Sequence, residues 1–177
     1  QRPVRLGPVP AVRVVADRDD VVKVRFQLDQ DEDGWPPVGS EGVWAEPLGD
    51  DQYGICNTPW FVLNLASEDV VVALADSDGV LWATGERIWS GRMTVRVIPF
   101  RAGPLGGDRQ AVLDAFEPFG VTGEGTEEWG IVALDIPPGA DLVAVKRELR
   151  AGQADGRWDC DEGCVSEAWI SWQCADL

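Results

Sequence analysis

Residues 41–71, EGVWAEPLGDDQYGICNTPWFVLNLASEDVV, decide how the first half of the chain folds. The runs GVWAEPL and GDDQYGI predict a β-hairpin with Gly49, Asp50 and Asp51 in its loop, because glycine and aspartate accept the backbone angles of tight turns. Residues 60–63 and residues 69–74 are each predicted to form a further short strand. Short strands with a turn about every 8–12 residues are typical of a small antiparallel sheet or barrel.

The flanking segments extend this β unit in both directions. Upstream, VVKVRFQL alternates apolar residues with charged or polar ones, and this period of two is typical of a half-buried strand. Downstream, Asp78 and Gly79 form a two-residue turn signal before VLWATGERIW. We therefore predict an antiparallel β unit over residues 21–92. Residues 1–20 are rich in proline and arginine and are expected to be an extended or mobile leader.

The pattern changes after residue 92. The runs MTVRVIPF, VTGEGT, WGIVALDIP and RWDCDEGCV predict strands, and DRQAVLDAFEPFG and ADLVAVKRELRAG predict helices, the second of which ends at Gly152. The resulting order β-α-β-β-α-β over residues 93–165 is that of a ferredoxin-like sheet with both helices on one face. The predicted fold class is therefore α+β, with a small N-terminal antiparallel β sheet or barrel packed on a C-terminal ferredoxin-like unit. Residues 166–177, which include Trp169, are predicted to be a tail that folds back over a core.

Acidic residues are concentrated in one part of the chain. No lysine or arginine occurs from residue 29 to residue 86, and the thirteen carboxylates there are Asp29, Asp31, Glu32, Asp33, Glu41, Glu46, Asp50, Asp51, Glu68, Asp69, Asp76, Asp78 and Glu86. The whole chain has a formal net charge of −16. A surface with charge of one sign repels itself, and a cationic partner offsets that cost. Nucleic acids and anionic membranes are disfavoured as partners, because both are bound through lysine and arginine.

The remaining composition indicates a cytoplasmic protein. No apolar run reaches the roughly 18 residues of a membrane span, and the first residues lack the apolar core of a signal peptide. Four cysteines are too few for a secreted disulfide scaffold, which favours a reducing compartment. The sequence leaves the oligomeric state open.

One set of residues resembles a known family. The pattern E-x-x-W-A-E-x-L from Glu41, then Tyr53, then N-x-P-aromatic from Asn57, then Glu68-Asp69-Val70 is similar to a bacterial domain-of-unknown-function family, number 4265. The resemblance covers about residues 21–165 and implies no activity, cofactor or catalytic residue. Two positions depart from the family pattern, since Cys56 stands where an acidic residue is usual and Trp60 where a phenylalanine is usual.

The absence of histidine excludes several kinds of catalytic and metal site. Without it, Ser-His-Asp and Cys-His catalysis and histidine-ligated metal sites are excluded. A reactive cysteine needs a lowered pKa, yet Cys160 is flanked by Asp159 and Asp161, whose charges raise it. The cysteines lack paired C-x-x-C spacing for zinc, and the acidic run after residue 28 lacks the bidentate acid and flanking helices of a calcium loop. We expect no cofactor and no metal.

The leading hypothesis is a non-catalytic acidic module that docks a basic protein partner. Exposed tryptophans among carboxylates have the composition of an interface hot spot, and the predicted contact residues are Trp35, Glu41, Trp44, Glu46, Asp50, Asp51 and Trp60. An immunity protein that neutralises a cationic toxin fits this description. One alternative is a carboxylate-dependent, glycosidase-like hydrolase that uses an acid pair such as Glu41 and Glu46. The other is a small-molecule-binding regulatory module in the second half of the chain.

Overall fold

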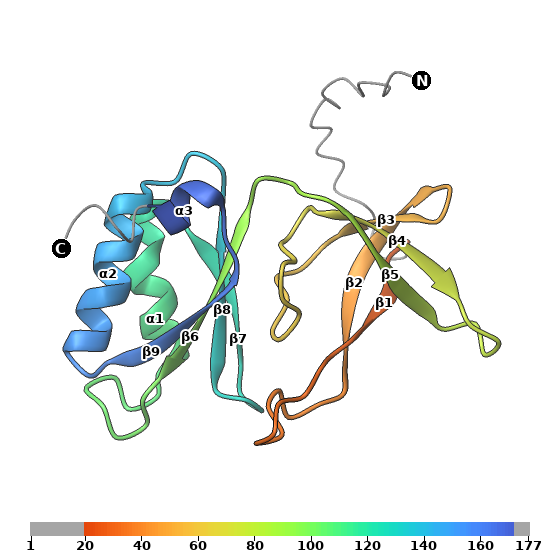
Figure 1. Ribbon diagram of the computed structural model, residues 1–177. Helices are drawn as coiled ribbons and strands as arrows, with labels where there is room; N and C mark the ends of the chain where they lie inside the picture. Colours follow the sequence, from red (N-terminus) through yellow and green to blue (C-terminus); the bar gives the residue numbers. More distant parts are fainter. Residues whose placement is uncertain (1–19, 172–177) are drawn as a thin grey trace.

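The computed structural model of the protein describes residues 20–171. The predicted leader lies outside the described residues, apart from its last residue, and so do the last six residues of the predicted tail. Two β units lie side by side, with a pair of helices on the far side of the second unit (Figure 1).

Five strands form a closed barrel in the order β1-β2-β3-β4-β5. They are β1 (Val22–Gln27), β2 (Ser40–Gly49), β3 (Gln52–Ile55), β4 (Val70–Ala75) and β5 (Leu81–Ile88). Strands adjacent in the chain pair antiparallel, and β5 closes the barrel by pairing parallel with β1. The prediction of a small antiparallel β unit is confirmed, in the form of a barrel.

The barrel core takes every second residue from its strands, as the alternation of side chains along a strand requires. Val43 and Ala45 of β2 are fully buried in it, as are Val24 of β1 and Ala73 of β4. The intervening residues of these strands therefore face outward. The outward-facing side chains are the ones that a partner could contact.

The prediction of a strand at residues 60–63 is wrong. This segment is part of an irregular loop, residues 56–69, between β3 and β4. The reason is that the Glu41 carboxylate accepts hydrogen bonds from the backbone N–H groups of residues 60, 61 and 62. Those N–H groups are then not available to a neighbouring strand.

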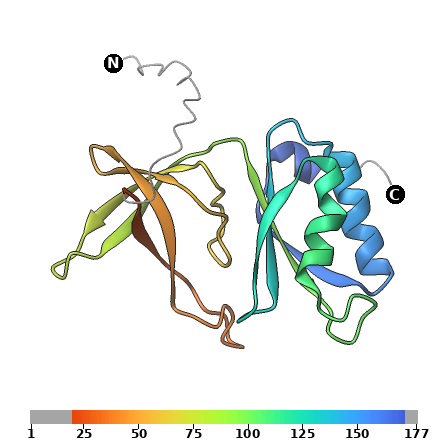
Figure 2. The same ribbon diagram turned by 180° about the vertical axis from the view of Figure 1, so that it is seen from behind.

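The second unit is a four-stranded antiparallel sheet in the order β7-β8-β6-β9. Its elements in chain order are β6 (Met93–Pro99), α1 (Arg109–Phe116), the short 3₁₀ helix η1 (Glu117–Phe119), β7 (Thr122–Thr126), β8 (Ile131–Ile136), α2 (Leu142–Ala154), β9 (Trp158–Cys164) and α3 (Glu167–Ser171). Helices α1 and α2 cover the face of the sheet that points away from the barrel (Figure 2). The fold is thus mixed α+β, and mostly sheet.

The core of the second unit lies between the sheet and these helices. It contains Val95, Leu134, Val145, Phe116 and the fully buried Trp158. Trp169 of α3 is also buried in it, so the start of the predicted tail does fold back over a core.

The prediction that Gly152 ends the second helix is wrong, because α2 continues to Ala154. Gly152 is buried within the helix, where a Cβ atom would lie 2.0 Å from the Trp158 ring. The glycine is needed for that close approach rather than for a helix end.

The loop of residues 56–69 packs between the barrel and the second unit. Its Asn64 N–H donates to the carbonyl of Gly163 in β9 at 2.8 Å, and its Leu65 carbonyl accepts from the Thr94 hydroxyl at 3.1 Å. Phe61 packs edge-on against Trp129, which precedes β8, at 5.8 Å between ring centroids. The loop is visible between barrel and sheet in Figure 1.

Candidate functional site

The structure divides the predicted contact residues into two groups. One group lies on the β2–β3 hairpin and comprises Trp44, Glu46, Asp50 and Asp51. The other group surrounds the loop of residues 56–69 and comprises Trp35, Glu41 and Trp60. The prediction placed all seven on one docking surface, whereas the structure distributes them over the hairpin and the surroundings of the loop.

Glu41 has a structural role. Its side chain is 7% exposed, and its carboxylate accepts hydrogen bonds from the backbone N–H groups of Trp60, Phe61 and Val62 at 2.7, 2.8 and 2.9 Å. Trp35 packs edge-on against Phe61 at 5.6 Å between ring centroids. These residues hold the loop in place, so the Glu41 carboxylate is not available to a partner.

Two more acids of the cation-free stretch form ion pairs with arginines of the same chain, Asp69 in the interior and Glu68 at the surface. Asp69 is fully buried and pairs with Arg87 at 2.9 Å, while it also accepts from the N–H groups of Ala66 and Ser90. Glu68 pairs with Arg92 at 3.5 Å. The acidic stretch is therefore partly an internal network and not wholly a surface.

Sequence reasoning missed the arginines that complete this network. Arg96 of β6 donates to the Phe61 carbonyl at 3.2 Å and to the Asp161 carboxylate at 2.5 Å, and Arg92 binds Asp135 with two hydrogen bonds. The signal was present at Arg96, because it is the one charged residue in the mostly apolar run MTVRVIPF, and a buried charge needs a partner.

The outer face of the barrel carries the remaining group. Trp44, Glu46 and Leu48 alternate with the inward-facing residues of β2 and so point outward. Cross-strand pairing aligns Glu46 with Gly54, Gly54 with Val70, and Val70 with Ile88. Outward-facing residues from β2 to β5 therefore form one continuous surface. The part of it that we call the outer barrel face comprises Trp44, Glu46, Leu48, Gly54, Val70, Val72, Glu86 and Ile88.

This face is unusually apolar for a surface. The exposed fractions of Trp44, Leu48 and Ile88 are 46%, 52% and 60%. Val70 and Val72 between them are half-buried. A contiguous exposed apolar surface is typical of an interaction site, whereas single exposed apolar residues are common everywhere.

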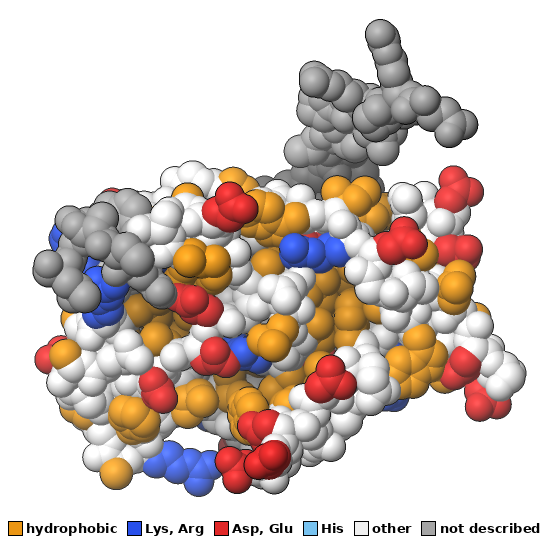
Figure 3. All heavy atoms as spheres, in the orientation of Figure 1, with side chains coloured by type: hydrophobic (Ala, Val, Ile, Leu, Met, Phe, Trp, Pro, Cys, Tyr) orange, Lys and Arg blue, Asp and Glu red, His pale blue; other side chains and the backbone are white. Residues whose placement is uncertain are grey.

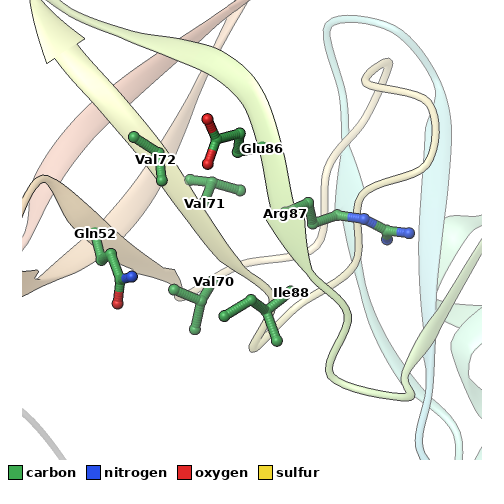
Figure 4. A pocket seen from close by; sticks show the side chains of 7 residues that line it. All are labelled: Gln52, Val70, Val71, Val72, Glu86, Arg87 and Ile88. Atoms are coloured by element: carbon green, nitrogen blue, oxygen red, sulfur yellow. The ribbon is translucent and has the colours of Figure 1, made fainter. Parts of the chain in front are cut away.

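A hollow of about 380 Å³ lies in the same face. Its lining comes from β3, β4 and β5 and consists of Gln52, Val70, Val71, Val72, Glu86, Arg87 and Ile88 (Figure 4). The hollow lies beside Gly54, which has no side chain, and the Leu48 side chain leans over that glycine from the neighbouring strand.

The charges on the outer barrel face are mainly negative. Strands β2, β3 and β4 contain no lysine or arginine. Lys23 of β1 lies over the Trp44 ring at 4.8 Å from its centroid, and the Arg87 side chain is bound to Asp69. Asp50 and Asp51 extend the negative charge to the exposed hairpin turn. Figure 3 shows acidic and apolar side chains interspersed over the barrel end of the molecule.

The described cysteines are not activated nucleophiles. Burial raises the pKa of Cys56, and the charge of Glu46 adds to the effect. Burial, with the charges of Asp159 and other neighbouring acids, raises the pKa of Cys160 to about 11. Burial also raises the pKa of Cys164. A nucleophilic thiol needs the opposite shift, since the thiolate is the reactive form.

The predicted acid pair does not converge on one substrate. The Glu41 side chain lies on the inner face of β2, where its carboxylate accepts hydrogen bonds from the loop of residues 56–69. The Glu46 side chain lies on the outer face of the same strand. Within residues 20–171, no group of three or more Cys, Asp or Glu side chains is placed to hold a metal ion. No helix in this part of the chain is long and apolar enough to cross a membrane.

Comparisons with known proteins give a family and a fold. The family model for a domain of unknown function, DUF4265, matches residues 41–160. No curated protein matches the chain. A solved structure of a hypothetical protein from Neisseria gonorrhoeae is 19% identical to the chain, with a TM-score of 0.67 over 81% of this chain and 94% of that one. At this identity the likeness shows the fold alone.

Proposed function

The chain belongs to the DUF4265 family, whose name states no activity, and we propose from its surface that it is a non-catalytic module that docks a basic protein partner. The docking site in this proposal is the outer barrel face together with the hairpin turn at Asp50 and Asp51. Of the residues predicted from the sequence, Trp44, Glu46, Asp50 and Asp51 keep a contact role.

The observation that carries the proposal is the combination of apolar exposure and negative charge on one face. Trp44, Leu48 and Ile88 are each close to half exposed or more. The face carries the carboxylates of Glu46 on β2 and Glu86 on β5, and β2, β3 and β4 contain no lysine or arginine. Exposed apolar side chains provide affinity when a partner covers them, and the surrounding charge selects the sign of that partner. Long-range attraction to such a face also speeds association.

A protein that covers a cationic surface of another protein would need exposed apolar side chains and negative charge on one face. An immunity protein that neutralises a basic toxin is one such protein, and we propose it as the biological class.

We also infer that the C-terminal unit is ferredoxin-like. The strand order β7-β8-β6-β9 and the two helices on one face support that inference.

The hydrolase alternative has less support, because Glu41 and Glu46 point to opposite sides of β2. The regulatory alternative would need a ligand on the sheet face toward the barrel, and there the loop of residues 56–69 already binds Thr94 and Arg96.

The test immobilises the full chain and captures basic proteins from a bacterial lysate at ionic strengths from about 0.01 M to about 1 M, across which the screening length falls from about 30 Å to about 3 Å. We expect capture to fall steeply with salt. We also expect the variant that combines Glu46→Gln, Asp50→Asn and Asp51→Asn to lose most of it at low salt.

A matched control removes the same charge from the other unit. Glu117, Glu127 and Glu128 are exposed there, and the triple change to glutamine should leave capture nearly unchanged. Capture that is insensitive to salt, or that both triple variants reduce equally, would overturn the proposal.

A further inference from the structure

We propose that the hollow in the outer barrel face holds one large aliphatic side chain from a cationic segment of the partner. This inference rests on the function proposed above and narrows the partner to a protein segment in which lysines or arginines flank a leucine-like residue.

The shape of the hollow carries the first step. Val70, Val72 and Ile88 provide an apolar lining on the outer side of β4 and β5. The volume of about 380 Å³ lies at the lower end of the roughly 300–1,000 Å³ that ligand sites occupy. An open apolar recess of that size suits a side chain better than a whole small molecule, which needs to be largely enclosed.

The charges around the hollow carry the second step. Glu86 is part of the lining, and Glu46 stands in the same cross-strand row as Gly54, Val70 and Ile88. Figure 4 shows the Glu86 carboxylate on the side of Val72. Arg87 also belongs to the lining, but its side chain extends away from the valines and its charge is paired with Asp69 at 2.9 Å. Carboxylates therefore border an apolar recess, which complements a segment with an apolar centre and cationic flanks.

The same charges argue against a second copy of this chain as the occupant. A symmetric dimer through this face would bring the negatively charged surface with Glu46 and Glu86 against an identical surface of the other copy. Like charges across an interface are unfavourable, so a cationic segment fits where a second copy does not.

The test compares two synthetic peptides on the full chain. Both have three lysines on each side of a central residue, which is leucine in one and alanine in the other. Both should bind more weakly as salt rises. The leucine peptide should bind about fivefold to tenfold more tightly than the alanine peptide, because about half of its extra apolar surface becomes buried in an open recess.

Two variants locate the site. Val72→Phe fills the hollow and should abolish the preference for leucine while the salt-dependent binding remains. Leu74→Phe is the matched control, since Leu74 is 52% exposed, lies two residues further along β4 and is not part of the lining. It should leave the preference intact.

The possible failures differ from one another. Equal, salt-dependent binding of both peptides to the native chain would overturn the hollow as an anchor site and leave the proposed function standing. Binding of neither peptide would overturn both. A leucine preference that survives Val72→Phe, or that Leu74→Phe also removes, would place the anchor elsewhere and overturn this inference.

Discussion

Glu41 and Glu46 lie on the same strand and have opposite surroundings, so the same substitution should have different effects at the two sites. Glu41→Gln replaces an oxygen acceptor with an amide donor beneath backbone N–H groups that are buried or half-buried. We expect a loss of about 2–3 kcal/mol in the free energy of unfolding, measured in urea, because a buried donor without its acceptor is costly.

Glu46→Gln is the control for that prediction. Its side chain is on the outer face of the strand, so the expected change is below about 0.5 kcal/mol. If the two variants were equally stable, the structural role of Glu41 would be wrong. If Glu41→Gln instead folded normally and only abolished a hydrolytic activity, the enzyme alternative would replace the binding proposal.

The cysteines allow a prediction about reactivity and pH. At pH 9 a thiol with the ordinary pKa of 9.0 is half ionised, whereas Cys160, with its pKa raised to about 11, is about one per cent ionised. A thiolate of higher pKa is intrinsically more nucleophilic, which restores about a factor of ten. Cys160 should therefore react with an aromatic disulfide reagent at least about fivefold more slowly in the folded chain than in urea.

Mass spectrometry of labelled peptides separates the sites. Among the three cysteines within residues 20–171, Cys56 is exposed and should label first, and the buried Cys164 should label slowly together with Cys160. Labelling of Cys160 at the same rate in the folded and the unfolded chain would contradict its placement. The direction of this shift was predicted from Asp159 and Asp161, but its largest cause, burial, depends on packing that neighbouring residues do not reveal.

At the scale of elements, Gly152 in α2 tests whether packing outweighs helix propensity. Replacing glycine by alanine inside a helix usually stabilises it by about 1 kcal/mol. Here the added Cβ would lie 2.0 Å from the Trp158 ring, and overpacking costs about 1–3 kcal/mol or more. We expect Gly152→Ala to lower the free energy of unfolding in urea, while Gln153→Ala at the exposed neighbouring position changes it little. A stabilised Gly152→Ala variant would refute the tight contact.

The regular elements were predictable where one local pattern dominates. The alternation in β1 and the helical spacing in α1 both correspond to observed elements. The errors occurred where a distant residue decides the outcome. Residues 60–63 have apolar, strand-like side chains, but the Glu41 carboxylate takes their N–H groups. Gly152 resembles a helix end until the Trp158 ring is placed against it.

The tryptophans show the same limit for the candidate site. Trp44 and Trp158 both occur in predicted strands, yet Trp44 is 46% exposed and Trp158 is fully buried. Alternation with Val43 and Ala45 indicates that Trp44 faces the other side of its strand, although it does not say which side is the core. The hollow beside Gly54 could not be predicted, because it depends on the register of neighbouring strands.

At the scale of the whole molecule, the negative charge has two roles. Glu41, Glu68 and Asp69 belong to the network that ties the barrel to the loop and to the second unit. Other acids of the cation-free stretch are exposed at the turn after β1, at the β2–β3 hairpin and at the β4–β5 hairpin. Charge at several hairpin ends gives a general attraction for cations, and the outer barrel face combines negative charge with exposed apolar side chains along adjacent strands.

The most direct measurement is an NMR titration of the isotopically labelled full chain with the lysine peptide that contains leucine. The amide shifts should change most in β2 to β5 around Trp44, Val70 and Ile88, and little at the acidic turn of residues 29–33. Changes that are largest at that turn, or that spread evenly over every exposed acid, would show that charge alone attracts the peptide and would contradict a docking site on the outer barrel face.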